Sequence, residues 1–408
     1  MIIKKQFIIY LLILIVILIF SLLLLGKKNG HPFYLKIRSI TINKIEIFKN
    51  SSVFKSYFIY KGTKEARKNF KEINFNEKRK ILLKNFLLDE EQVKFYKIKN
   101  NELYNIIDKH IERSKYLKNF TKNFGIRINQ NSRFNISKPD SNAKIFKVTY
   151  YDINHYGILE ESKKKNIKKK LIIYVQGHLG NPYNKKYYLD LKEYFIEKDY
   201  DIFSLGMIGR GFNYQANVKY PNSTNKDKLL TYNHENIKFF YDKNYPNKQP
   251  MSIFLSGNYF LIKNLLQINK YEEVIFVGVS SGGLYGKIFS SLINEIDSTY
   301  IFNGSAPCFL QIFTDTKGDW ESCEKKLYGK INYWQFYKMA SKNEINQNKQ
   351  LILIYNKKDK CCFRDPTASI MLEISKKLND DKFRVLTYSK VKFHGANLDL
   401  LISDLKLN

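Results

Sequence analysis

The residues best suited to chemistry form the segment Gly278–Gly282, which has the pattern G-x-S-x-G with Ser280 at its centre. A strand-like apolar run precedes it at 274–277, and a helix-like run follows at 284–289. A tight strand-to-helix turn of this kind lifts the serine hydroxyl into a cleft, and its glycines are needed because a Cβ atom there would clash. We therefore predict that Ser280 is a nucleophile and that the backbone N–H of Ser281 faces a developing oxyanion.

Three further residues follow strand-like apolar runs elsewhere in the chain, namely His178, Asp359 and His394. Because the carboxyl ends of parallel strands meet at one edge of a sheet, we expect all three near Ser280. A serine hydroxyl is a weak nucleophile at neutral pH and needs a base. His394 would take its proton and return it to a leaving group, and Asp359 would orient the imidazole.

Each of these assignments has an alternative. Asp359 is surrounded by lysines and could be a solvated turn residue, and His394 could be a surface histidine. Asp365 is the nearest rival acid, and Asp315 or Asp319 could serve if the acid follows the preceding strand.

The elements that must position these residues follow from the hydrophobic pattern. Strands are predicted at 146–150, 156–159, 171–175, 200–205, 274–277, 300–302, 351–355 and 383–387. The first two strands suggest a hairpin, and the continuous apolar run 171–175 is typical of a parallel strand buried on both faces. Helix-like segments such as 187–197 separate the later strands, which predicts an α/β fold with a doubly wound, mostly parallel sheet.

With these features in order, residues 143–408 resemble an α/β-hydrolase over about two-thirds of the chain. The hairpin, the turn at Gly177–Gly180, the serine turn and the late Asp and His follow the order of that family. Segments 318–321 and 359–363 also resemble a poorly characterised bacterial branch. One departure is Gln176, which stands where many members have a histidine before the oxyanion loop.

The resemblance implies a triad of Ser280, Asp359 and His394, and an oxyanion hole formed by the backbone N–H groups of Ser281 and His178. The side chain of His178 is then expected to be structural or to face the substrate. The implied activity is cleavage of small or lipid-like carboxylic esters through an acyl-enzyme, without metal or organic cofactor. Peptidase and thioesterase activities use the same machinery. A non-catalytic binding module at the membrane surface is a further alternative, and it predicts that a triad member is missing.

The N-terminal part suggests attachment to a membrane. Phe7–Leu25 is uncharged and rich in Ile and Leu, and at about 1.5 Å per residue it spans roughly 28 Å, close to a bilayer core. Residues 1–28 are therefore predicted to be an uncleaved signal-anchor. More lysines and arginines follow this segment than precede it, and the positive-inside rule taken literally would keep the remainder in the cytoplasm. Because lysine is abundant throughout the chain, this count carries little weight. We expect residues 143–408 on the non-cytoplasmic side.

Residues 29–142 are expected to form an accessory α+β region and linker. Strand-like alternation from 27 to about 60 gives way to a helical pattern from about 64 to 124. Between two later strands, 305–348 is long for a connection and could form a cap over the serine or a peripheral helix pair with aromatic packing.

Composition and cysteines add limits. The net charge is +31, but lysine far outnumbers arginine, which argues for a solvated surface and against nucleic acid as a partner. The four cysteines show no metal-ligand spacing, so no metal site is expected. In an oxidising compartment, Cys308 or Cys323 could pair with Cys361 or Cys362.

Overall fold

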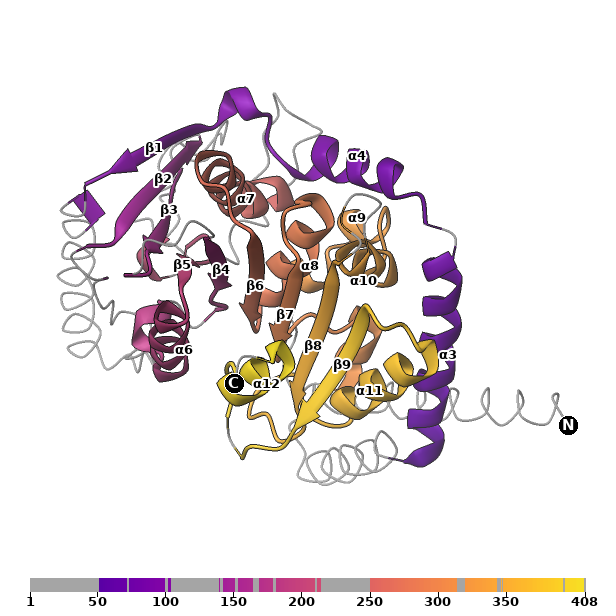
Figure 1. Ribbon diagram of the computed structural model, residues 1–408. Coiled ribbons are helices and arrows are strands. Elements are labelled where there is room, and N and C mark those ends of the chain that lie inside the picture. The colour runs from indigo at the N-terminus through magenta and orange to yellow at the C-terminus, as the bar shows by residue number, and fades with distance from the viewer. Residues whose placement is uncertain are drawn as a thin grey trace, which may run out of the picture. The chain divides into compact units, whose positions relative to one another are not determined.

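Figure 1 shows the computed structural model of the protein, whose chain divides into the units Met1–Phe58 and Ile59–Asn408. The structure describes residues 51–71, 73–99, 102–103, 139, 142–150, 153–163, 169–178, 181–209, 211–213, 250–313, 320–342, 346, 348–391 and 393–406. The predicted anchor at Phe7–Leu25 and residues 27–50 of the segment predicted as strand lie outside these residues. The end of that segment is helical instead, in α3 (Ser52–Lys71), so the strand prediction is wrong there: Phe54 and Phe58 are four residues apart and their rings meet on one face of the helix. Within the described ranges, no helix has the length and apolar character that a membrane span needs.

The second unit is built on a nine-stranded sheet with the order β1-β2-β3-β5-β4-β6-β7-β8-β9 (Figure 1). The strands are β1 (Lys94–Ile98), β2 (Lys144–Tyr150), β3 (Ile153–Glu160), β4 (Lys170–Val175), β5 (Tyr200–Leu205), β6 (Glu273–Val279), β7 (Ser298–Phe302), β8 (Gln350–Asn356) and β9 (Phe383–Tyr388). The pairs from β1 to β3 and the pair β3–β5 are antiparallel, and every pair from β5 to β9 is parallel. The predicted α/β class with a mostly parallel sheet is therefore confirmed.

Helices cover both faces of this sheet. The helices of the described residues are α3 (Ser52–Lys71), α4 (Phe75–Phe86), α6 (Lys186–Glu197), α7 (Pro250–Ile268), α8 (Gly282–Leu292), α9 (Lys325–Tyr328), α10 (Tyr333–Ser341), α11 (Thr367–Leu378) and α12 (Leu398–Leu405), and those that cover the sheet include α6, α7, α8, α10 and α11. Alternate side chains of one strand serve two cores, as β4 shows: Leu171, Ile173 and Val175 pack with side chains of α7 and α8. Ile172 and Tyr174 pack with side chains of α6 and α12 on the other face. The apolar run of β4 is thus explained by burial on both faces.

One strand was not expected. β1 lies inside the stretch 64–124, whose pattern predicts helix, and it pairs antiparallel with β2 at the sheet edge. Only two of its five residues are even partly buried, so its sequence Lys-Phe-Tyr-Lys-Ile carries little of the alternation that marks a strand. The helical prediction holds for α4, where Leu82 and Phe86 are buried.

The segment 305–348 divides into parts with different roles. α10 packs on α8 and on β7, β8 and β9, so it is a covering helix of the sheet, with Trp334 and Tyr337 buried. The earlier part contains two short 3₁₀ helices, η5 (Cys308–Phe313) and η6 (Trp320–Cys323). The cap remains a prediction for this earlier part alone.

The expected pairing between distant cysteines is wrong. Cys308 is bonded to Cys323, with Cα atoms 5.6 Å apart, so this bridge joins η5 to η6. Cys361 is bonded to its neighbour Cys362. Both bonds are therefore local, with sequence separations of 15 and 1, and neither joins the insertion to the loop after Asp359.

Candidate active site

Ser280 occupies the turn between β6 and α8 with a left-handed backbone, φ +58°. A non-glycine residue rarely adopts this conformation, and it persists only where the surroundings impose it. Here the N–H of Ser280 donates to the carbonyl of Phe302 at 2.8 Å, and its own carbonyl accepts from the N–H of Gly283 at 2.9 Å. The backbone therefore has the sharp strand-to-helix turn that the sequence predicts.

Neighbouring backbone leaves no space for side chains at the predicted glycines. A Cβ on Gly282 would lie 2.1 Å from the carbonyl oxygen of Val175, and one on Gly278 would lie 2.6 Å from the carbonyl oxygen of Gly282. Gly304 was not singled out from the sequence, yet a Cβ there would lie 2.1 Å from the carbonyl oxygen of Ser280. The turn is thus held between β4 and the segment that follows β7.

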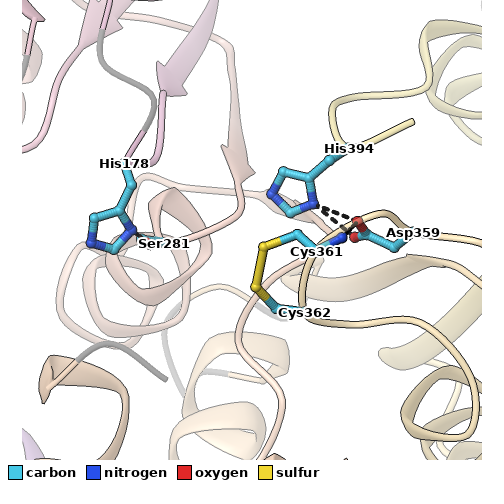
Figure 2. The surroundings of a disulfide bond; sticks show 6 residues. All are labelled: His178, Ser281, Asp359, Cys361, Cys362 and His394. Carbon is cyan, nitrogen blue, oxygen red and sulfur yellow. Dashed lines mark hydrogen bonds and ion pairs between the residues drawn. A yellow bond between two sulfur atoms is a disulfide. The ribbon is translucent and has the colours of Figure 1, made fainter. Parts of the chain in front are cut away.

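The loop after β4 lies directly against this turn. A Cβ on Gly177 would lie 2.9 Å both from the backbone nitrogen of Ser281 and from Cβ of Ser280. The next residue, His178, directs its ring at Ser281, and its Nδ1 hydrogen-bonds the Ser281 hydroxyl (Figure 2). The structure therefore brings together the two residues whose backbone N–H groups are expected to form the oxyanion hole.

A buried acid–imidazole pair forms at the ends of β8 and β9. Nδ1 of His394 lies 2.7 Å and 3.0 Å from the two carboxylate oxygens of Asp359, as Figure 2 shows. The Asp359 side chain is 0% exposed and that of His394 is 5% exposed, so the pair is shielded from water. Because the carboxylate accepts at Nδ1, that nitrogen carries the proton, and Nε2 is the nitrogen left to act as a base.

The rival acids do not occupy this position. The side chain of Asp365 accepts from the N–H and the hydroxyl of Ser369, at 3.0 and 2.7 Å, within the first turn of α11. Asp315 and Asp319 lie outside the described residues. Asp359 is therefore the acid that the structure places on His394, while contact between His394 and Ser280 stays a prediction.

Sequence reasoning missed the role of two asparagines that hold the loops of Asp359 and His394. Asn356, the last residue of β8, donates from Nδ2 to the carbonyls of Lys390 and Phe393, both at 2.7 Å. Its Oδ1 accepts from the N–H of Lys358 at 3.1 Å, so one side chain ties the loop of the acid to the loop of the base. Asn303, which follows β7, accepts from the N–H of Asn356 at 2.7 Å. The available signal was a single buried amide at the end of an apolar run.

The departure at Gln176 has a structural counterpart. Its Oε1 accepts from the hydroxyls of Tyr174 and Tyr187, at 2.6 and 3.2 Å. Burial raises the pKa of Tyr187 to about 12, so that hydroxyl stays a donor at neutral pH. The Tyr187 ring also packs closely on Gly395, where an added Cβ would lie 2.6 Å from it. Gln176 thereby supports the segment that follows His394.

Comparison with known proteins gives similarity at the level of solved structures. No family model and no curated protein matches the chain. An esterase from Pyrococcus furiosus is 13% identical, with a TM-score of 0.42, over 67% of this chain and 94% of its own. Acetyl xylan esterase 1 from Thermoanaerobacterium sp. is 12% identical, with a TM-score of 0.45, over 82% and 98%. An acylaminoacyl peptidase from Pyrococcus horikoshii is 14% identical, with a TM-score of 0.39, over 61% and 37%.

The assignment of the fold rests on the chain's own geometry. A left-handed serine joins a parallel strand to a helix in the middle of the sheet, and the acid and the histidine follow later strands in the order Ser280, Asp359, His394. The α/β-hydrolase fold predicted from the sequence is thus confirmed.

Proposed function

We propose that the protein is a serine hydrolase that cleaves carboxylic esters through an acyl-enzyme intermediate. The observation that carries the proposal is the left-handed Ser280, which follows one strand of the sheet. The buried pair of His394 and Asp359 follows two other strands of the same sheet. All three residues follow carboxyl ends of parallel strands, where sites on such sheets form. The described residues include every expected member of the triad, which argues against a non-catalytic binding module.

The proposed chemistry assigns one task to each group. Ser280 attacks the carbonyl carbon of the ester while Nε2 of His394 removes the hydroxyl proton, and His394 then returns that proton to the departing alkoxide. Asp359 stabilises the imidazolium that forms in between. The oxyanion would be held by the backbone N–H groups of His178 and Ser281, and a single such donor contributes about 3 kcal/mol in other hydrolases. Water repeats the sequence on the acyl-enzyme and releases the acid.

A fluorophosphonate probe tests the nucleophile. The wild-type protein should be labelled on Ser280, and Ser280→Ala should not be labelled at all. Ser281→Ala is the matched control, since it removes the adjacent hydroxyl and should still be labelled, at a lower rate. Equal labelling of the wild type and Ser280→Ala would disprove the assignment.

A panel of substrates tests the reaction class. Ester, thioester and aminoacyl amide substrates with the same acyl group should be compared by kcat/KM. We expect the esters to be cleaved fastest. A preference for the aminoacyl amides or for the thioesters would instead indicate a peptidase or a thioesterase that uses the same triad.

We further propose that Phe7–Leu25 anchors the protein in a membrane, with residues 143–408 on the non-cytoplasmic side. The disulfide between Cys308 and Cys323 supports this placement, because such bonds persist in oxidising compartments. Protease treatment of intact cells should digest the domain. A thiol-alkylating reagent should increase the mass of the protein only after its disulfides have been reduced. Full protection together with four free thiols would place the domain in the cytoplasm.

A further inference from the structure

We propose that Glu321 is a positioning residue that acts through the His178 side chain to hold the oxyanion hole in place. The proposal rests on the function proposed above, since it concerns the geometry of the same site. It assigns a role to the earlier part of the 305–348 insertion, which the triad leaves without one.

The contacts form a chain of three side chains from separate parts of the sequence. Oε1 of Glu321 lies 3.6 Å from Nε2 of His178, and Nδ1 of the same ring hydrogen-bonds the hydroxyl of Ser281 (Figure 2 shows the second contact). His178 and Ser281 are also the residues whose backbone N–H groups are expected to hold the oxyanion. The side chains therefore connect the two donors to each other.

Burial and charge make Glu321 a firm attachment point. Its side chain is 0% exposed, whereas that of His178 is 19% exposed. A fully buried carboxylate is stable only near a cation or hydrogen-bond donors, and Nε2 of His178, 3.6 Å from Oε1, is placed to act as its ion-pair partner. With one nitrogen facing Glu321 and the other bonded to Ser281, the ring can neither flip nor rotate without losing a contact. A fixed ring in turn fixes the backbone of residue 178.

The disulfide explains why Glu321 keeps its position. Glu321 belongs to the short helix η6, which includes Cys323 and is bonded through it to Cys308. Cys308 begins η5, close after β7 in the chain. The bridge thus connects the carboxylate to the sheet that carries the triad.

Preorganisation predicts a specific kinetic result. A donor displaced from its position weakens the transition state without weakening the bound substrate, so kcat should fall while KM stays nearly constant. With p-nitrophenyl acetate as the probe, we expect Glu321→Ala to lower kcat by about 10- to 100-fold, less than the 10²–10³-fold loss on removing a whole donor. Glu321→Gln keeps the shape and an acceptor oxygen and should recover part of that loss. Glu324→Gln, in the same insertion, keeps the side-chain oxygen that accepts from the N–H of Lys326 and should leave kcat unchanged.

Inhibitors separate positioning from a general loss of structure. A trifluoromethyl ketone forms a tetrahedral oxyanion on the serine, and the matching secondary alcohol does not. Glu321→Ala should weaken the ketone by the same factor as kcat and leave the alcohol unaffected. The His178→Gln and Glu321→Gln losses should also be less than additive when combined, because both act through one ring. Since Glu321→Gln preserves the shape of the side chain, this cycle serves even if the alanine variant does not fold.

The outcomes distinguish this proposal from the proposed function. If the wild type cleaves no ester and is not labelled, the proposed function fails. If the wild type is active and depends on Ser280, but Glu321→Ala keeps its kcat or weakens both inhibitors equally, the positioning role is disproved while the hydrolase stands. Additive losses in the double variant would also disprove it.

Discussion

Ser280 combines a proposed chemical role with an unfavourable backbone. Its φ of +58° would suit glycine, but glycine has no side chain that could serve as a nucleophile. Left-handed conformations of non-glycine residues cost on the order of 1–3 kcal/mol and concentrate at functional sites. The surrounding glycines and the hydrogen bonds to Phe302 and Gly283 are what hold the turn in this conformation.

At the residue scale, the clearest prediction concerns Asp359. Asp359→Asn should lower kcat by about 10⁴-fold with little change in KM, because an amide no longer fixes the Nδ1–H tautomer of His394 or stabilises its cation. Steady-state kinetics on p-nitrophenyl acetate measures the loss. Asp365→Asn is the control, since that side chain caps α11 and should cost stability but not activity. A larger loss of activity at 365 than at 359 would reverse the assignment of the acid.

The residues that the sequence revealed are those with a local signal. Ser280 lies in a recognisable turn, and Asp359 and His394 each follow a buried strand. Asn356 also stands at the end of a buried strand, but its bonds to Lys390 and Phe393 depend on partners far away in the chain, as does the contact of Glu321 with His178. No periodicity in the sequence around Glu321 indicates that its carboxylate is buried beside His178.

At the element scale, buried strands were predictable and an edge strand was not. β4 is apolar throughout because both of its faces are covered. β1 lies at the edge of the sheet and is mostly exposed, so lysines are tolerated at two of its five positions. These lysines interrupt the alternation of apolar and polar residues that would mark a strand. The pairing of the cysteines was mistaken for a related reason, since it depends on loop positions that hydrophobic patterning does not encode.

The turn between β6 and α8 should tolerate no side chain at Gly282. Gly282→Ala places a Cβ 2.1 Å from the carbonyl oxygen of Val175, so we expect loss of fluorophosphonate labelling and a markedly lower melting temperature. Gly286→Ala lies one turn later in the same helix, where the nearest atom is a Phe276 ring carbon at 3.1 Å. Alanine at 286 requires the Phe276 ring to shift by a few tenths of an ångström, which the gain of about 1 kcal/mol in helix propensity partly offsets, so this variant should keep its labelling. A stable, fully labelled Gly282→Ala variant would contradict the close packing of the turn.

The loops at the ends of β8 and β9 should depend on Asn356. Asn356→Ala removes the part-buried hydrogen bonds to the carbonyls of Lys390 and Phe393, at a cost of at most about 1–3 kcal/mol each. We expect a fall in kcat of at least 10-fold together with a lower melting temperature. Asn379→Ala is the control: it changes the left-handed C-cap of α11, so it should lower the melting temperature without lowering kcat. Unchanged kcat in Asn356→Ala would show that the two loops hold each other without it.

At the scale of the whole molecule, stability should fall in acid because of His155. Its ring is fully buried, and its Nε2 bonds the Gly206 carbonyl and the Asn258 side-chain oxygen at 3.1 and 2.6 Å. Burial lowers its pKa from 6.5 to about 4. The unfolded chain therefore binds a proton that the folded chain does not, and folding stability falls as the pH decreases from about 6.5 to about 4. The loss should be on the order of 3 kcal/mol.

Urea titrations between pH 7 and pH 4 measure this effect. His155→Gln should start from a lower free energy of unfolding, because it disturbs the hydrogen bonds to Gly206 and Asn258. It should then lose less stability over this interval than the wild type does. Parallel curves for the two proteins would show that acid acts through other groups.

The position of β9 has a consequence for how the protein would lose activity on warming. In the part of the chain that the structure describes, β9 pairs with β8 alone, whereas β6 has a neighbour on each side. Marginal elements open at lower free energy than central ones. Fraying of β9 would carry His394 off Asp359 while Ser280 stays in its turn, so catalytic half-life on warming would be set by one outer strand. A sample could then show the circular dichroism of the folded protein after its activity has been lost. Stabilising β9 would lengthen the half-life of activity without any change to the core.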